Sequence, residues 1–195
     1  MQNFKTQRLH WNYFLAIEED LEKISRYIEF SEQNMKTYSI ELAHILLSAS
    51  SEVDTIMKQI CKLFDPNLKV RNIDGYRNVI QLNLSSLIDE EFSIDRFGLK
   101  YRPWERWNND KNPDWWLKYT KVKHQRNEFF QEANLVNTIN AVGALLIAQV
   151  YYYRLAFSKE AEMDLSFRET THHLSPEATF VRMSEDYYCQ HLVTD

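Results

Sequence analysis

Apolar residues recur at three- and four-residue steps along much of the chain, which is the spacing of one face of an α-helix. The first such stripe predicts a helix over residues 8–30, and a second, longer stripe predicts a helix over 35–64. The pattern resumes at Asp114 and predicts one helix, or two nearly collinear helices, over 114–157 with many small residues. These segments are expected to supply most of the core.

The remaining segments carry weaker signals. Residues 74–87 are expected to form a short helix with Asp74 as its N-cap. Residues 92–101 are expected to form a small β-hairpin or an extended strip, and a weak helical signal follows Ser175 in the tail. No repeat or linker divides the chain.

We therefore expect one domain, 1–195, with its core in 8–64 and 113–157. Residues 65–112 would be a variable insert and 158–195 a C-terminal extension. Three glycines and four prolines in 195 residues exclude collagen-like, low-complexity and most turn-rich all-β designs. The predicted fold class is all-α: an up-and-down helical bundle of four to five main helices, with the hairpin as an insert.

Net charge and the number of cysteines limit the binding partners, the metal sites and the cellular compartment that we expect. The net charge of −5 gives no strong global attraction to nucleic acid, so any such site must be a local patch. Cys61 and Cys189 are too few and too far apart for a disulfide framework or a zinc site. The start of the chain has no signal-peptide pattern, and the most apolar run, 141–153, is shorter than a membrane span. We expect a cytoplasmic protein without a membrane partner.

Four of the five tryptophans lie between Trp104 and Trp116, beside prolines and basic residues. Such a cluster either stacks nucleic-acid bases or closes one end of a helical core. The second interpretation is favoured.

The segment from Lys118 to Arg126 holds three lysines, a histidine and an arginine. If the helix continues through it, six uncharged polar residues form one narrow stripe: Thr120, His124, Asn127, Gln131, Asn134 and Thr138. This stripe indicates a polar groove or a subunit contact, or else an ordinary solvated face. Glu52 falls within the apolar arc of the second helix, where it either has a partner or reaches solvent at the edge.

The string Trp-Trp-x-x-Tyr-x-x-Val-Lys-His-x-Arg over 115–126, followed by Phe-Phe-x-x-Ala-Asn-Leu, resembles proteins of the HEPN superfamily. Residues 45–53 also resemble the acidic second helix of some members. The resemblance implies a four- or five-helix bundle that forms a homodimer, typical of bacterial stress and phage-defence systems. In active members the dimer builds a composite cleft that cleaves RNA without a metal.

The family signature is an arginine, four to six residues, and a histidine, and this chain departs from it. The permitted positions before His124 hold Leu117, Lys118 and Tyr119. The spacing from Arg168 to His173 matches formally, but it lies in the tail and such matches arise by chance.

Metal-independent cleavage needs a proton-transfer residue and positive charge for the transition state. His124 would transfer the proton, while Arg126 and Lys123 would hold phosphate. The supporting residues would be Glu52, Asn127, Lys118 and Lys121. In the non-catalytic alternative, Lys123, His124 and Arg126 form a structural network with Glu52.

Two functions follow. The first is a HEPN-like, metal-independent endoribonuclease or an RNA- or nucleotide-binding protein, active without a cofactor. The second is a catalytically inactive dimerisation module that binds a protein partner. The adjacent His172 and His173 have no further ligands at metal-binding spacing, so no metal site is expected.

Overall fold

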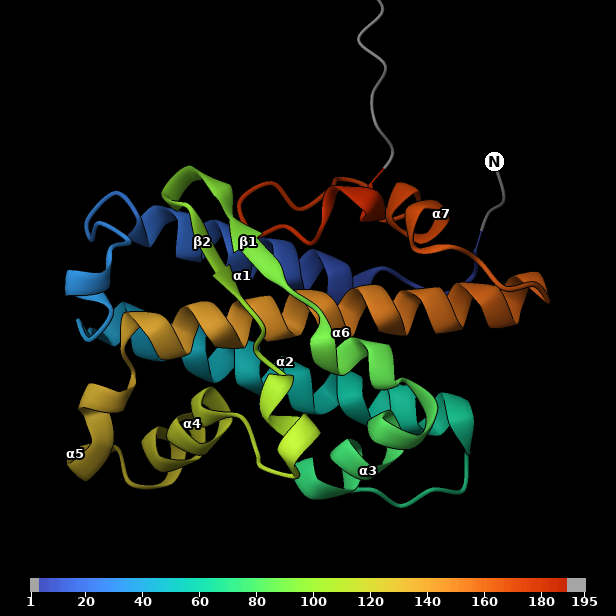
Figure 1. Cartoon of the computed structure of the whole chain (residues 1–195), viewed down its shortest axis with the longest axis horizontal. Helices are drawn as coiled ribbons and strands as arrows, with labels where there is room; N and C mark the ends of the chain where they lie inside the picture. Colours follow the sequence, from blue (N-terminus) through green and yellow to red (C-terminus); the bar gives the residue numbers. More distant parts are fainter. Residues whose placement is uncertain (1–3, 189–195) are drawn as a thin grey trace, which may run out of the picture.

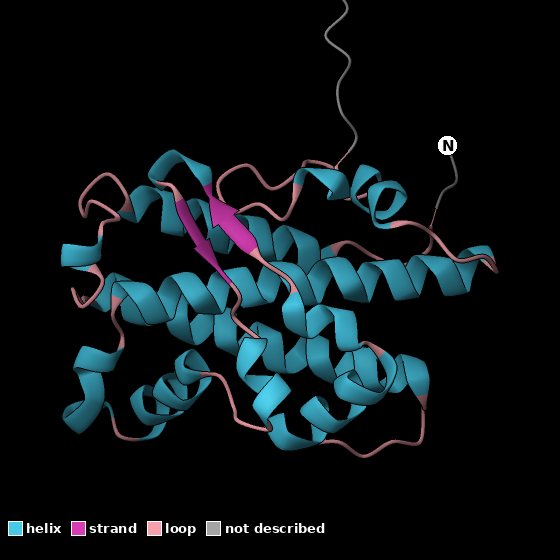
Figure 2. Ribbon diagram, viewed as in Figure 1, coloured by secondary structure: helices cyan, strands magenta, loops and turns pink. Residues whose placement is uncertain are grey.

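A computed structural model describes residues 4–188, and helices dominate it (Figure 1, Figure 2). The predicted mostly helical fold is confirmed. Its α-helices are α1 (Leu9–Ile24), α2 (Ile40–Phe64), α3 (Ile73–Asn83), α4 (Asp114–His124), α5 (Arg126–Phe129), α6 (Leu135–Ala161) and α7 (Phe167–His172). Its 3-10 turns are η1 (Glu32–Asn34), η2 (Ser85–Asp89), η3 (Asp95–Phe97), η4 (Glu105–Asn109), η5 (Phe130–Glu132) and η6 (Glu185–Tyr187).

The core is built around α6. This helix packs most extensively against α2 and also contacts α1, α4 and α7. In Figure 1, α6 crosses the centre of the molecule, with α1 on one side and α3 and α4 on the other. Every residue from 141 to 151 of α6 is buried. The helix is apolar on all its faces, and such a helix is stable when other elements surround it.

The small hairpin is confirmed. Strands β1 (Phe92–Ile94) and β2 (Leu99–Tyr101) pair antiparallel, and Gly98 in the connecting turn has a φ of 64°. The hairpin lies across α6, where the missing side chain of Gly143 makes room for the Phe92 ring. Ser93 also exchanges two backbone hydrogen bonds with Arg182, which ties the tail to the hairpin.

The ends of the first two helices differ from the prediction. The first helix ends at Ile24, six residues before the expected boundary, because the Ser25 hydroxyl donates to the Glu22 carbonyl and a turn follows. The second begins at Ile40 rather than 35, since the Ser39 side chain accepts the Leu42 N–H and caps it. Side-chain caps of this kind outweigh an apolar stripe that runs past them.

Two further boundaries are corrected. The N-cap of α3 is Asn72, whose side chain accepts the Gly75 N–H, and not Asp74. This helix also ends at Asn83 instead of 87. In the tail, residues 176–184 are not helical, and the described part of the chain after them contains only the short 3-10 turn η6. The helix lies earlier, in α7, where Ser166 and Glu169 form a capping box.

The segment after α7 is held on α1 by a buried carboxylate. Glu18 is only 5% exposed, and its Oε1 accepts the backbone N–H groups of Thr179, Phe180 and Val181 at 2.8–3.1 Å. Trp11 adds a bond from its Nε1 to the Pro176 carbonyl at 2.8 Å. The tail is therefore part of the packed structure up to residue 188.

The tryptophan cluster is buried, which confirms the packing interpretation over the base-stacking one. Trp104, Trp107, Trp115 and Trp116 are between 0 and 9% exposed. The Trp104 ring contacts those of Trp107 and Trp115, and Trp115 contacts Trp116. The Trp115 Nε1 donates to the Pro103 carbonyl at 3.0 Å. No face of these rings is available to a nucleic-acid base.

Helix α6 is long and apolar enough to cross a membrane by length and composition. However, 83% of its most apolar stretch is buried inside the protein, as in the core helix of a soluble protein.

Cys61 is buried and unpaired, and burial raises the pKa of its thiol to about 11. Cys189 lies outside the described residues.

Candidate functional site

The candidate residues lie on a turn and not on a continuous helix. Helix α4 ends at His124, and Gln125 leaves the helical conformation with φ −138° and ψ 48°. The chain then forms α5 and η5 before α6 begins. Because α4 packs against α6, the expectation of one helix or two collinear helices over 114–157 is wrong. Residues 123–128 are all polar and exposed, so no apolar face holds a helix through them.

The predicted polar stripe is broken by the same turn. Thr120 and His124 are exposed on α4, whereas Asn134 caps α6 by accepting the Asn137 N–H. Thr138 is fully buried, and its hydroxyl donates to the Leu42 carbonyl at 3.2 Å. The six residues therefore do not share one face.

The three lysines of the segment have partners. Lys118 Nζ lies 2.7 Å from Glu132 Oε1 and joins α4 to η5. Lys121 Nζ lies 4.8 Å from the centre of the Phe129 ring, and Lys123 Nζ donates to the Tyr119 hydroxyl at 3.2 Å. Lys118 is thus neutralised, while Lys121 and Lys123 remain exposed with their charge uncompensated by a carboxylate.

His124 and Arg126 are both exposed and form no hydrogen bond or ion pair within residues 4–188. Arg126 and Asn127 line a surface hollow of about 480 Å³, which we call the Arg126 hollow. Its other lining residues are Ile40, Ala43, His44 and Phe130. The structure therefore brings Arg126 and Asn127 together in a hollow that His124 does not line.

Glu52 has a different partner from the one expected. Its Oε1 lies 2.5 Å from His10 Nδ1, and the two side chains are 12% and 23% exposed. Of the two alternatives for Glu52, a partner or solvent at the edge of the arc, the structure shows the partner. This partner comes from α1 and not from the segment around His124, so Glu52 does not support that segment through this contact. The structural network of Glu52 with Lys123, His124 and Arg126 is therefore not formed.

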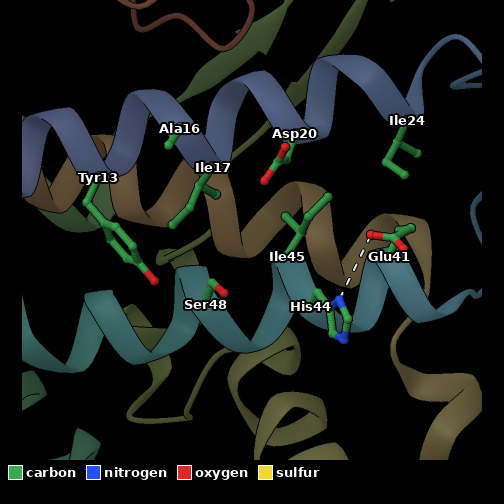
Figure 3. Close-up of a pocket in the computed structure, with 9 residues that line it drawn as sticks. All are labelled: Tyr13, Ala16, Ile17, Asp20, Ile24, Glu41, His44, Ile45 and Ser48. Carbon is green, nitrogen blue, oxygen red and sulfur yellow. Dashed lines mark ion pairs between the residues drawn. The ribbon is translucent and has the colours of Figure 1, made fainter.

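His44 is the residue that sequence reasoning missed. It is exposed on α2 and lines both the Arg126 hollow and a second hollow of about 230 Å³, the α1–α2 groove (Figure 3). Asp20 and Glu41 lie on the rim of this groove, and His44 Nδ1 is 3.9 Å from Glu41 Oε2. No pattern along the chain indicates this position, because α5 and α2 are about 80 residues apart.

The tail histidines lie elsewhere. His173 contacts the Phe4 ring edge-on at 4.9 Å, and burial together with His172 lowers the pKa of its ring. Helix α7 and the α4–α5 turn are at opposite ends of α6 in Figure 1. The Arg168–His173 spacing therefore does not belong to the Arg126 hollow.

Comparison with known proteins found no matching family model, no matching curated protein and no matching solved structure. No similar protein therefore indicates what the residues around Arg126 bind.

Proposed function

We propose that this chain is a HEPN-like cytoplasmic protein that binds RNA or a nucleotide at the Arg126 hollow, with metal-independent RNA cleavage as its candidate reaction. The observation that carries the proposal is the unpaired Arg126 guanidinium on the wall of this hollow. An exposed cation without a carboxylate partner is available to a phosphate group, which a guanidinium contacts through two parallel hydrogen bonds.

Other groups of the hollow fit the same ligand. Phe130 is half-buried, lines the hollow together with the arginine, and meets the Tyr38 ring edge-on at 5.7 Å. Aromatic rings next to positive charge are the usual platform for the bases of single-stranded nucleic acid. Asn127 supplies a side-chain donor and acceptor, and Lys121 and Lys123 extend the positive charge along α4.

RNA cleavage additionally needs a proton-transfer group. Two histidines flank Arg126 in this proposal: His124, two residues earlier in the chain, and His44 from the facing helix α2. Histidine is the side chain that most often serves as a general acid or base in proteins. The bacterial stress or phage-defence setting rests on the family resemblance alone.

Fluorescence anisotropy with a labelled single-stranded RNA tests binding. Arg126→Ala should weaken the affinity about ten-fold, because a charge-assisted hydrogen-bonded contact is lost. The slope of log affinity against log salt should fall by about 0.7 for one phosphate contact. The matched control is Arg96→Ala on the exposed hairpin turn, which should bind as the wild type does. Equal affinity of the two variants would refute RNA binding at this hollow.

Cleavage is tested on the same RNA in the presence of a chelator. If His124 transfers the proton, His124→Ala should lower the cleavage rate by ~10²–10⁴-fold, and His44→Ala should have little effect. The reverse result would assign the role to His44. If the protein binds the RNA but does not cleave it, it is an RNA-binding protein, and the nuclease function is excluded.

A second candidate function is that of an interaction module that forms a homodimer. The α1–α2 groove carries Asp20 and Glu41, and the neighbouring hollow carries Arg126, with His44 shared between them. In a two-fold dimer about this face, the acidic rim of one protomer meets the partner subunit's Arg126, and the reverse contact forms equally. Exposed Tyr38 and Ile40 would add apolar area to the interface.

Sedimentation analysis of charge-reversed variants tests the dimer. Glu41→Arg and Arg126→Glu alone should each shift the protein toward a 23.5 kDa monomer, and the double variant should restore the dimer. A wild-type monomer at high micromolar concentration would exclude this interface. Glu41→Arg also separates the two proposals, since it disrupts the dimer without removing the Arg126 phosphate contact.

A further inference from the structure

A second positively charged hollow lies at the other end of α2 from Arg126. It measures about 650 Å³ and is formed by the last turns of α2 together with the loop that leads to α3. Its cationic lining residues are Lys58, Lys62, Lys69 and Arg71. We call it the Lys69 hollow.

Three of these four cations have no partner in the described part of the chain. Only Lys58 is paired, in a bond with Asp54 on the same helix. Asp65, which precedes the lining residue Pro66, accepts the Asn67 N–H at 2.9 Å and forms no ion pair with these cations in the described residues. The hollow therefore keeps a local positive charge on a chain whose net charge is −5.

Helix capping explains only part of this charge. Lys62 lies in the last turn of α2, where a cation offsets the negative end of the helix dipole. Lys69 and Arg71 are in the connecting loop, outside any helix, and have no such role. Three like charges around one hollow repel one another unless an anion lies between them.

The remaining walls are apolar. Leu68 and Val70 are half-buried, and Pro66 completes this side of the hollow. Asn67 also lines the hollow, and its side-chain amide forms no hydrogen bond within the described residues. An apolar wall with one free amide suits a flat heterocycle, which packs by its face and bonds by its edge.

We propose that the Lys69 hollow binds a nucleoside polyphosphate, with its phosphates on Lys62, Lys69 and Arg71 and its base against Leu68 and Val70. The volume falls within the range of small-molecule sites. This site is separate from the Arg126 hollow and does not depend on the function proposed there.

Calorimetric titration of the full chain with ATP and with inorganic triphosphate tests the proposal. Wild-type protein should bind ATP more tightly than triphosphate. Lys69→Ser with Arg71→Ser should weaken ATP binding at least about ten-fold, because two charge-assisted contacts are lost. The matched control is Lys100→Ser with Arg102→Ser, an exposed pair with the same spacing on and after β2 that contacts Glu91.

A third variant separates the base from the phosphates. Leu68→Ala should weaken ATP binding and leave triphosphate binding unchanged. Equal affinity of ATP and triphosphate would overturn the assignment to a nucleotide. Absence of ATP binding at millimolar concentration would overturn the site, as would equal effects of the Lys69/Arg71 and Lys100/Arg102 variants. RNA binding that depends on Lys69 and Arg71 without ATP binding would also overturn it, in favour of a nucleic-acid surface.

Discussion

Helix α6 and the α4–α5 turn are adjacent in sequence and have opposite physical characters. α6 carries no charged residue before Arg154, and most of its first two dozen residues are buried. The segment 123–128, with the sequence Lys-His-Gln-Arg-Asn-Glu, is exposed at every position. The first is a single 27-residue helix, whereas the second is interrupted at Gln125. The difference shows that burial of an apolar face maintains a helix where local propensity alone does not.

The two regions should also respond differently to substitution. A change in α6 or its contacts must disturb close packing, and it should therefore lower the free energy of unfolding. A change in the α4–α5 turn removes groups that contact little else in the described structure, and it should affect ligand binding or assembly instead.

The largest loss of stability is expected at Gly143. A Cβ atom at this position would lie 2.1–2.3 Å from atoms of the Phe92 ring, so Gly143→Leu should cost more than about 3 kcal/mol in unfolding free energy. Denaturant unfolding of the wild type and the variant measures this difference in free energy. Gly98→Ala is the control, since no atom lies within 4 Å of its Cβ and only the left-handed conformation is strained, at about 1–2 kcal/mol. A double variant with Phe92→Ala should lose less than the sum of both changes.

The next largest effect is expected at Glu18. Glu18→Ala leaves the N–H groups of residues 179–181 without an acceptor and should cost about 2–3 kcal/mol. Hydrogen exchange should become faster at these amides before it does in α6. Glu22→Ala, at an exposed position one turn later, should change neither quantity. Unchanged exchange at 179–181 would mean that other contacts hold the tail.

The contribution of Glu18 to the stability of the fold should also depend on pH. Burial raises the pKa of the Glu18 carboxyl above its usual 4.5, against the opposing effect of the three N–H donors. A raised pKa in the folded state means that the stability contribution is present below the unfolded pKa and is lost as the pH rises through the folded pKa. The stability of wild type relative to Glu18→Gln should therefore fall as the pH increases from about 4. An increase with pH would show that the N–H donors outweigh burial.

The sequence predicted the apolar helices and the hairpin because both are recorded in local spacing. It did not predict where α1 ends or where α2 begins, since the Ser25 and Ser39 hydroxyls form single hydrogen bonds at those boundaries. For the candidate site, local spacing and tertiary packing contribute differently. Arg126 and Asn127 do line a hollow, but His44 enters it from α2 and Glu52 pairs with His10, and such contacts depend on tertiary packing rather than on spacing.

A smaller effect is expected at Glu52. Glu52→Gln removes a charged hydrogen-bond partner of His10 in a half-buried pair and should cost about 1 kcal/mol. A double-mutant cycle with His10→Gln should show a coupling energy. The exposed pair Glu41–His44, 65–70% exposed on the same helix, is the matched control and should show almost none. Equal coupling in both pairs would mean that burial does not strengthen the Glu52 contact.

The smallest effect on stability is expected in the α4–α5 turn. His124→Ala and Arg126→Ala should each change the unfolding free energy by less than about 0.5 kcal/mol, because neither side chain has a hydrogen-bonding partner in the described residues. Denaturant unfolding under conditions that keep the protein monomeric measures this. Lys118→Ala is the informative neighbour, since it removes the bond to Glu132 that joins α4 to η5 and should cost more than either. If Arg126→Ala instead destabilised the monomer as much as Lys118→Ala, Arg126 would belong to the scaffold, and the contrast between a packed α6 and a turn available to ligands would no longer hold.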